Sequence, residues 1–432
     1  MARTDRGYIQ GRILSTLFFL LILLNPILRY YNLGSSGIGM ENLMSILALL
    51  TGVILIYTRL PVRTLNRGPL IKSRRRFLVF GVWALIITFI YEFFTEINIH
   101  NPLANYSNNL FIVMAINIVL IYIIISAKYE VTQLFRIYSV IVWFLLGLIL
   151  FQWLLFLTGR SMSFKIPFMQ YTSGWSSLQN KNFGMSPYPR ALFSEKSHFA
   201  QYILPYVAIC LYSEKIVPKR RILKAIIASI AILTTVSGNG IIVLLVEWLL
   251  YFIALSNMSP RNKMLFGTAG IALLFLVYIL LQNFESFSLM FDTLFSSENN
   301  RASKADYRIY RGLDMFRQLP IVAQLLGIGN SHMYMYASMH GISSIYDVRW
   351  SVYEYFSAIF EIAIYYGLTG LVLCGLHLKE ILFAKTKVTT GLIIMMLALW
   401  ISTEMIFRNY HLFYMLLIVG SYAFENQGDN LS

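Results

Sequence analysis

The sequence has little charge and almost no cysteine. Asp, Glu, Lys and Arg make up only 13% of its 432 residues, whereas 57% of the residues are hydrophobic. This composition excludes an ordinary soluble domain and indicates a polytopic membrane protein. The two cysteines, Cys210 and Cys374, lie far apart in apolar segments. Their number and placement exclude a disulfide framework and predict packing residues.

Familiar catalytic motifs are also absent. The sequence contains no Walker loop, no dinucleotide-binding fingerprint and no Gly-x-Ser-x-Gly elbow, and each of these would have indicated a known chemistry. His332 and His340 lack a third ligand at zinc spacing, so we expect no metal and no other cofactor.

Apolar runs predict an all-α, polytopic membrane protein with about twelve membrane-spanning helices in a single domain, residues 1–432. The first run is expected to stay in place as a span, because no convincing signal-peptide cleavage site follows it. Lys and Arg cluster in every second short loop and are missing from the others, which places both termini in the cytoplasm. The runs lie near residues 13–32, 42–58, 77–97, 109–127, 137–158, 198–213, 222–236, 240–256, 264–281, 352–376, 388–406 and 410–424.

The formal net charge of +15 is explained largely by these loops. The basic runs at residues 59–76 and 214–224 are typical of topology signals that touch anionic lipid, so we predict membrane lipid and not nucleic acid as their partner. Two long outer segments, residues 159–197 and 282–351, carry further cations. Topology does not require those cations, so they are the first functional clue.

The second long segment contains a stripe of cations. If residues 301–312 form a helix at roughly 100° per residue, these cations fall within one arc of about 80°. Such a stripe is either an ordinary solvated face or a clamp for phosphate or pyrophosphate, which the arginine fork suits. Gly312 lies beside it and would let a ligand or another helix come close. The stripe consists of Arg301, Lys304, Arg308 and Arg311.

The first long segment ends in "YPRALFSEKSHFAQYILP", residues 188–205. Ser194 is predicted to cap the following helix, and Glu195 and His198 can share a face. Glu195 is either a carboxylate that favours the positive end of the helix dipole or, like His198, a proton acceptor held near Arg190. In the tenth predicted span, Glu354 and Glu361 share a face as ion-pair or rim residues, or as part of a site.

The order of these segments resembles a family. "RALFSEKSHFAQYILP", the spacing from Arg301 to Gly312, "LLGIGNSH" and "EYFSAIFEIAIYYGLTGLVL" are similar to successive motifs of bacterial O-antigen polymerases and of their capsule and exopolysaccharide relatives. The resemblance covers roughly residues 190–375. It implies an integral-membrane glycosyltransferase of the GT-C type that joins undecaprenyl-pyrophosphate-linked oligosaccharides at the outer face of the bacterial inner membrane.

The resemblance also implies roles for residues and partners. Arg190, Arg301, Lys304, Arg308 and Arg311, with Gly312, would hold the pyrophosphate. Glu195 is the first candidate for the base, followed by His198, with His332, His340 and Glu354 behind them. A chain-length-regulating co-polymerase is an implied partner.

Three positions depart from the pattern. Phe356 stands where the related O-antigen ligases carry a histidine, Gln201 replaces the glycine of a paired first-loop motif, and Ser237-Gly238-Asn239 replaces a Ser-Arg turn. Two alternatives stay open. The first is a ligase, which Phe356 opposes. The second is a flippase or exporter of lipid-linked sugar, which should show two similar halves or charges spread through the spans.

Overall fold

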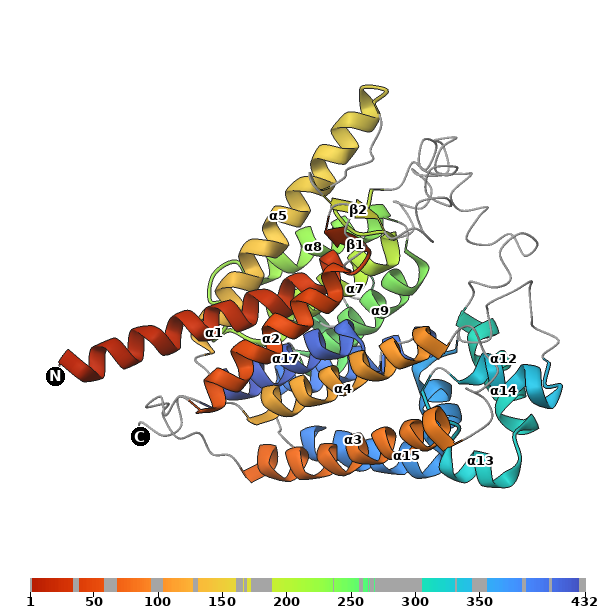
Figure 1. The fold of residues 1–432 in the computed structure, drawn as a ribbon. Coiled ribbons are helices and arrows are strands. Elements are labelled where there is room, and N and C mark those ends of the chain that lie inside the picture. Colours follow the sequence, from red (N-terminus) through yellow and green to blue (C-terminus); the bar gives the residue numbers. More distant parts are fainter. Residues whose placement is uncertain are drawn as a thin grey trace. The chain divides into compact units, whose positions relative to one another are not determined.

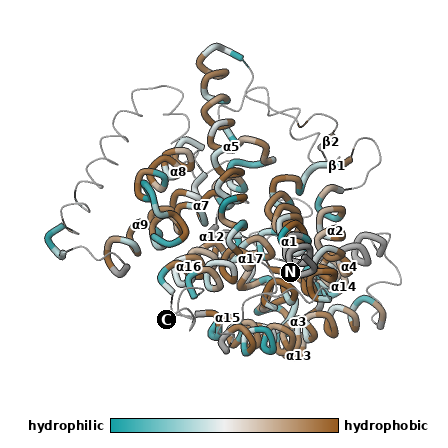
Figure 2. Tube along the Cα trace, turned by 90° about the vertical axis from the view of Figure 1, so that its left-hand side faces the viewer, coloured by the Kyte–Doolittle hydropathy of each residue, from teal (hydrophilic) through white to brown (hydrophobic). Residues whose placement is uncertain are grey.

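The structure is a computed structural model. It describes residues 2–33, 39–57, 68–94, 104–126, 131–160, 166, 169–171, 189–235, 237–255, 259–262, 264, 268, 305–330, 332–343, 356–382, 386–403 and 406–426. Its regular elements are almost all helices (Figure 1), and hydrophobic residues dominate most of them (Figure 2). The prediction of an all-α membrane protein is therefore confirmed at this level.

Five helices in the described part of the chain are long and apolar enough to cross a membrane. Three shorter apolar helices, within Phe111–Ser126, Gly238–Ile253 and Lys387–Ile401, also coincide with predicted spans. The predicted span at 264–281 lies almost entirely outside the described residues, and the total of twelve stays a prediction. The five long segments are Gln10–Leu28, Met40–Tyr57, Leu70–Phe93, Thr132–Leu157 and Ala358–Ile381.

The chain divides into two compact units. The first comprises Met1–Val140, Pro167–Thr172 and Ala302–Ser432, and the second Ile141–Ile166 and Ser173–Arg301. Helix α5 (Thr132–Leu157) begins in the first unit and continues in the second.

The elements of the first unit, besides the start of α5, are α1 (Ala2–Leu28), β1 (Tyr31–Leu33), α2 (Met40–Tyr57), α3 (Gly68–Phe94), α4 (Ala104–Ser126), β2 (Met169–Tyr171), α12 (Ala305–Gln318), α13 (Ile321–Leu326), α14 (Met333–His340), α15 (Ala358–Leu382), α16 (Lys387–Ser402) and α17 (Asn409–Glu425). In this unit, α15 lies along α3, and the short helices α12 to α14 gather at one end of this pair (Figure 1). Helix α17 is the core of this unit, because every residue from Asn409 to Ala423 is buried. The strands form a small antiparallel ribbon with Tyr31 opposite Tyr171.

Ile406 and Phe407, in the connection between α16 and α17, are buried. Phe407 adopts a left-handed backbone conformation with φ of 50°, and its carbonyl accepts a hydrogen bond of 2.7 Å from Asn117 in the middle of α4. Its ring packs against Phe80 of α3 and Tyr366 of α15. Non-helical backbone inside a membrane protein must be satisfied by other protein groups, and Asn117 does this for Phe407.

In the second unit, α7 (Lys196–Tyr212) is the buried centre. It packs against α8 (Arg221–Thr235) and α9 (Gly238–Leu250), and a short π-helix, η1 (Tyr251–Leu255), follows α9. Ser237 caps α9 by accepting from the amide of Gly240, and Gly238 and Asn239 are the first two residues of this helix. A Cβ on Gly240 would lie 2.4 Å from the Cβ of Ala200, so this glycine permits the close packing of α9 on α7.

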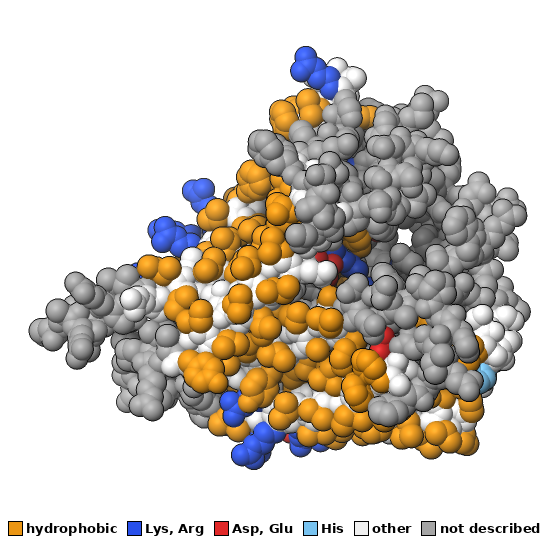
Figure 3. All heavy atoms as spheres, in the orientation of Figure 1, with side chains coloured by type: hydrophobic (Ala, Val, Ile, Leu, Met, Phe, Trp, Pro, Cys, Tyr) orange, Lys and Arg blue, Asp and Glu red, His pale blue; other side chains and the backbone are white. Residues whose placement is uncertain are grey.

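Hydrophobic side chains cover much of the described surface that is visible in Figure 3. On α5, the side chains of Phe144, Leu150 and Leu157 are 58%, 64% and 76% exposed. Exposed apolar surface of this extent would make a soluble protein aggregate, whereas lipid covers it in a membrane protein. Cys210 and Cys374 are buried and unpaired, as expected of packing residues.

Candidate functional site

The turn that carries Arg190 is held by a residue of α5. The side-chain oxygen of Gln152 accepts hydrogen bonds from the backbone amides of Arg190 and Ala191, at 2.9 and 2.8 Å. The Arg190 guanidinium in turn donates through Nη1 to the carbonyl of Ser194 at 2.9 Å. Arg190 therefore belongs to a short, internally bonded turn just before α7.

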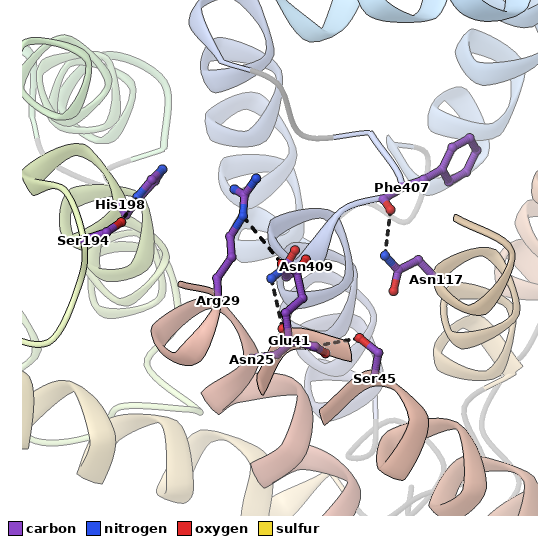
Figure 4. Close-up of polar contacts among 9 residues, drawn as sticks. All are labelled: Asn25, Arg29, Glu41, Ser45, Asn117, Ser194, His198, Phe407 and Asn409. Carbon is purple, nitrogen blue, oxygen red and sulfur yellow. Dashed lines mark hydrogen bonds and ion pairs between the residues drawn. The ribbon is translucent and has the colours of Figure 1, made fainter. Parts of the chain in front are cut away.

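The start of α7 differs from the prediction. The N-cap is Glu195 and not Ser194, and its side chain makes no capping bond. Because Ser194 lies one residue before the cap, its hydroxyl reaches the next helical turn and bonds with Nδ1 of His198 at 3.2 Å (Figure 4). Ser197 donates to the Glu195 carboxylate at 3.0 Å. The two candidate bases are thus oriented by two different serines.

Lys196 lies beside these groups at the first position of α7. Burial lowers the pKa of its ammonium group from 10.5 to about 8, because a low-dielectric surrounding disfavours the charged form. A cation held in such a place is favoured when an anion binds nearby.

We expect this pKa to appear in the pH dependence of stability. Between pH 8 and 10.5 the unfolded chain keeps the Lys196 proton and the folded chain releases it, so the contribution of this group to stability should rise with pH in that window. Lys196→Met should therefore be more stable than the natural protein at neutral pH, with a difference that shrinks toward pH 10.5. Thermal unfolding in detergent at several pH values measures this difference. The exposed Lys219 provides the control Lys219→Met, and an identical pH slope for both variants would contradict the assignment.

In the first unit, helix α12 carries the described part of the basic stripe. Arg308 is half-buried, whereas the side chain of Arg311 is completely buried, which an ordinary solvated face would not produce. Gly312 lies against α15, because a Cβ at this position would be 2.5 Å from the Cβ of Phe360. The close approach expected at Gly312 is therefore that of another helix. Arg301 and Lys304 lie outside the described residues.

Two glycine-containing segments meet next to α12. The amides of Ile328 and Gly329 donate to the carbonyls of Ile364 and Tyr365, at 3.1 and 2.9 Å. Gly367 interrupts α15 with φ of 71° and ψ of −178°, a conformation that is essentially restricted to glycine. A Cβ on Gly367 would lie 2.3 Å from the carbonyl oxygen of Leu325. "LLGIG" and "YYGLTG" therefore form one backbone-to-backbone junction.

The junction continues into a buried acid and imidazole pair. Nε2 of His332 lies 2.7 Å from Oε2 of Glu92, near the end of α3, and both side chains are almost fully buried. Nδ1 of His332 makes no hydrogen bond within the described part of the chain. An imidazole held by a carboxylate on one nitrogen can accept a proton on the other, but here that nitrogen is not exposed. Thr88 of α3 also accepts from the amide of Asn330 at 3.0 Å.

The remaining histidine and glutamate candidates are scattered. His340 is exposed at the end of α14, with its ring 4.3 Å from that of Tyr336. Glu361 is buried at the start of α15 and pairs with Arg408 at 3.7 Å, as the ion-pair interpretation predicts. Glu354 lies outside the described residues. In the part of the chain that is described, no three His, Cys, Asp or Glu residues are grouped as metal ligands.

A second polar cluster joins α1, α2 and α17 (Figure 4). Asn25 donates to Ser45 at 2.9 Å and accepts from Asn409 at 3.0 Å, and Arg29 lies 3.8 Å from Glu41. Polar groups inside an apolar bundle are stabilised only when they are hydrogen-bonded, so this cluster holds the three helices in one arrangement.

Sequence reasoning missed Gln152 and could not identify the partner of Glu92. Gln152 is an amide within the apolar run "LILFQWLLFL", and Glu92 is an acid within the apolar end of α3. A polar side chain inside an apolar run signals an internal partner. Its identity could not be read from the sequence, because Gln152 is 38 residues from Arg190 and Glu92 is 240 residues from His332.

The function of this chain has to be argued from the residues described above. Their contacts within each unit, together with the sequence pattern, are what a functional proposal must explain. No protein-family model matches this sequence, and no curated protein is significantly similar to it.

Proposed function

We propose that the chain is a membrane-embedded polysaccharide polymerase that joins undecaprenyl-pyrophosphate-linked oligosaccharide repeat units at the outer face of a bacterial inner membrane. The observation that carries the proposal is the junction around Gly327 and Gly367. The two segments that resemble successive polymerase motifs bond to each other through their backbones, next to the helix with the buried Arg311. The contact joins the two motifs in one junction, which is a physical reason for both to be present in the same chain.

In the proposed reaction, a hydroxyl of one lipid-linked repeat attacks the anomeric carbon of the growing chain on a second lipid. The bond from that carbon to the pyrophosphate oxygen breaks, and undecaprenyl pyrophosphate leaves with the electron pair. Cleavage of the bond between the sugar and the pyrophosphate supplies the free energy, so neither a nucleotide nor a metal is part of the proposal. Negative charge grows on the leaving group, and fixed cations that face such charge usually supply the largest share of catalysis.

The arginines are proposed as these cations. Arg190 sits on a bonded turn, and Arg308 and Arg311 are held on a packed helix, so each guanidinium loses little freedom when it meets a phosphate. Glu195 is the first candidate to take the proton of the attacking hydroxyl. His198 is the second candidate, and His332, paired with Glu92, stands behind them with His340 and Glu354.

Two further features bear on the alternatives. Phe356, at the position of the ligase histidine, is fully buried and offers no proton-transfer group. A transporter would need an alternating pathway between two related halves. A polymerase needs only one outer site, and both long cation-rich segments are predicted on the outer side. A co-polymerase that regulates chain length is a proposed partner.

Purified protein in lipid vesicles, supplied only with lipid-linked repeat units, tests the proposal. We expect a ladder of longer lipid-linked chains and release of undecaprenyl pyrophosphate without ATP. Transfer of the repeats to lipid A core instead would identify a ligase. Movement of intact repeats across the vesicle membrane, without elongation, would identify a transporter. Either of these two results would overturn the proposal.

A further inference from the structure

Gln152 lies where a polar side chain is costly. It is on α5 between apolar residues, and its side chain is 1% exposed. A buried amide is destabilising unless hydrogen bonds within the protein replace those to water. Its contacts therefore explain its presence in an otherwise apolar stretch.

Three contacts of Gln152 reach the same two residues, Arg190 and Ala191. Its oxygen accepts from the amides of Arg190 and Ala191, and its nitrogen lies 3.4 Å from the carbonyl of Ala191. Ala191 has φ of 51°, a left-handed conformation that is unfavourable for a residue with a Cβ. In this turn the two successive amides point at one oxygen, so the hydrogen bonds to Gln152 stabilise the strained conformation.

The turn fixes the direction in which Arg190 leaves the backbone. The amide of Phe193 closes the turn on the carbonyl of Arg190 at 3.1 Å, and the guanidinium bonds to the carbonyl of Ser194. The rings of Phe193 and Tyr202 then pack 5.5 Å apart and anchor the turn on α7. Arg190 is thus tied to α5 on one side and to α7 on the other.

We infer that Gln152 is a positioning residue, which holds the turn at 190–191 so that the Arg190 guanidinium faces the pyrophosphate of the lipid-linked substrate. The inference rests on the proposed function, because it needs an anionic ligand at Arg190. It goes beyond that proposal by assigning a role to a residue inside a predicted membrane span.

A contact elsewhere on α5 provides a matched control. Trp143 donates to the hydroxyl of Tyr206 on α7 at 3.0 Å, so Trp143→Phe also removes a hydrogen bond between α5 and the segment that follows the turn. It leaves the bonds of Gln152 intact. A role in helix packing alone would make Gln152→Leu and Trp143→Phe behave alike.

The test compares Gln152→Leu, Gln152→Glu, Trp143→Phe and Arg190→Ala in vesicles. Binding of undecaprenyl pyrophosphate and elongation of lipid-linked repeats are both measured. For Gln152→Leu we expect about tenfold weaker binding, as one lost positioning contact predicts, and about 100-fold lower kcat with a small change in KM. Gln152→Glu keeps an acceptor oxygen at the same place and should recover most of the binding and most of kcat. Trp143→Phe should resemble the natural protein.

The outcomes separate the two proposals. If the natural protein elongates repeats and Arg190→Ala does not, but Gln152→Leu behaves as Trp143→Phe does, the role of Gln152 is overturned and the polymerase stands. If the natural protein does not elongate repeats, the polymerase is overturned. In that case, loss of pyrophosphate binding in Gln152→Leu with recovery in Gln152→Glu still supports the positioning role, and unchanged binding refutes it.

Discussion

Arg190→Ala and Arg308→Ala are each expected to lower the rate of repeat elongation by about 10²- to 10³-fold, the effect of removing one donor that faces developing negative charge. In cells, single lipid-linked repeats should persist while long polymer disappears. The reason is electrostatic, because in the proposed reaction the leaving pyrophosphate gains negative charge. A guanidinium held by a bonded turn or a packed helix stabilises that charge without reorganising. Gel analysis of chain length in cells, and elongation by purified protein, measure the effect.

Two other arginines provide controls. Arg317 is exposed on the same helix as Arg308, and Arg160 is exposed three residues beyond the end of α5. Arg317→Ala and Arg160→Ala remove the same charge from the protein, so a general effect of net charge would appear in them as well. Normal chain-length ladders from Arg190→Ala and Arg308→Ala, at natural protein levels, would remove the arginines from the mechanism.

Gly367→Ala should be the most destabilising single-methyl change in α15. Its φ of 71° disfavours any residue with a Cβ, and the new atom would meet the carbonyl of Leu325 at 2.3 Å and the amide of Gly327 at 2.6 Å. Both neighbours are backbone atoms that cannot rotate away. We expect a loss of about 3 kcal/mol or more, which is a large share of the stability of a typical domain. Thermal unfolding and the yield of monodisperse protein in detergent measure this loss.

The same helix provides a control glycine. A Cβ on Gly375 would have no atom within 4 Å, so Gly375→Ala adds helix propensity without a clash. It should be neutral, or stabilising by about 0.5–1 kcal/mol. Equal stabilities for Gly367→Ala and Gly375→Ala would show that the junction between "LLGIG" and "YYGLTG" does not form as described.

The positions of the helices could be predicted from the sequence because they depend on local hydrophobicity. The runs predicted at 42–58 and 410–424 differ by only a few residues from α2 and α17. The run predicted to begin at 77 starts nine residues earlier, at Gly68, because the basic segment before it continues the helix and Pro69 suits a first turn. Hydropathy alone does not detect a helical segment that continues beyond the apolar run with polar residues.

The contacts of the candidate site could be predicted only between residues that lie close together in the sequence. The proximity of Ser194, Glu195 and His198 follows from helical spacing, although the cap falls at Glu195. Which serine orients which base depended on the helix start, which propensities place only to within a few residues. The partners Gln152 and Glu92 required the fold, because hydrogen bonds between distant residues leave no periodic pattern.

The sequence by itself determined that this is a helical membrane protein with cations concentrated in two long segments, because composition and periodicity act locally along the chain. Only the tertiary structure decided which contacts those segments make within each unit. In the folded chain Arg311 is buried, Gly327 packs against Gly367, and the turn of Arg190 is hydrogen-bonded to Gln152. These outcomes depend on close packing and hydrogen-bond geometry between residues far apart in sequence. Only a folded chain brings such residues within bonding distance.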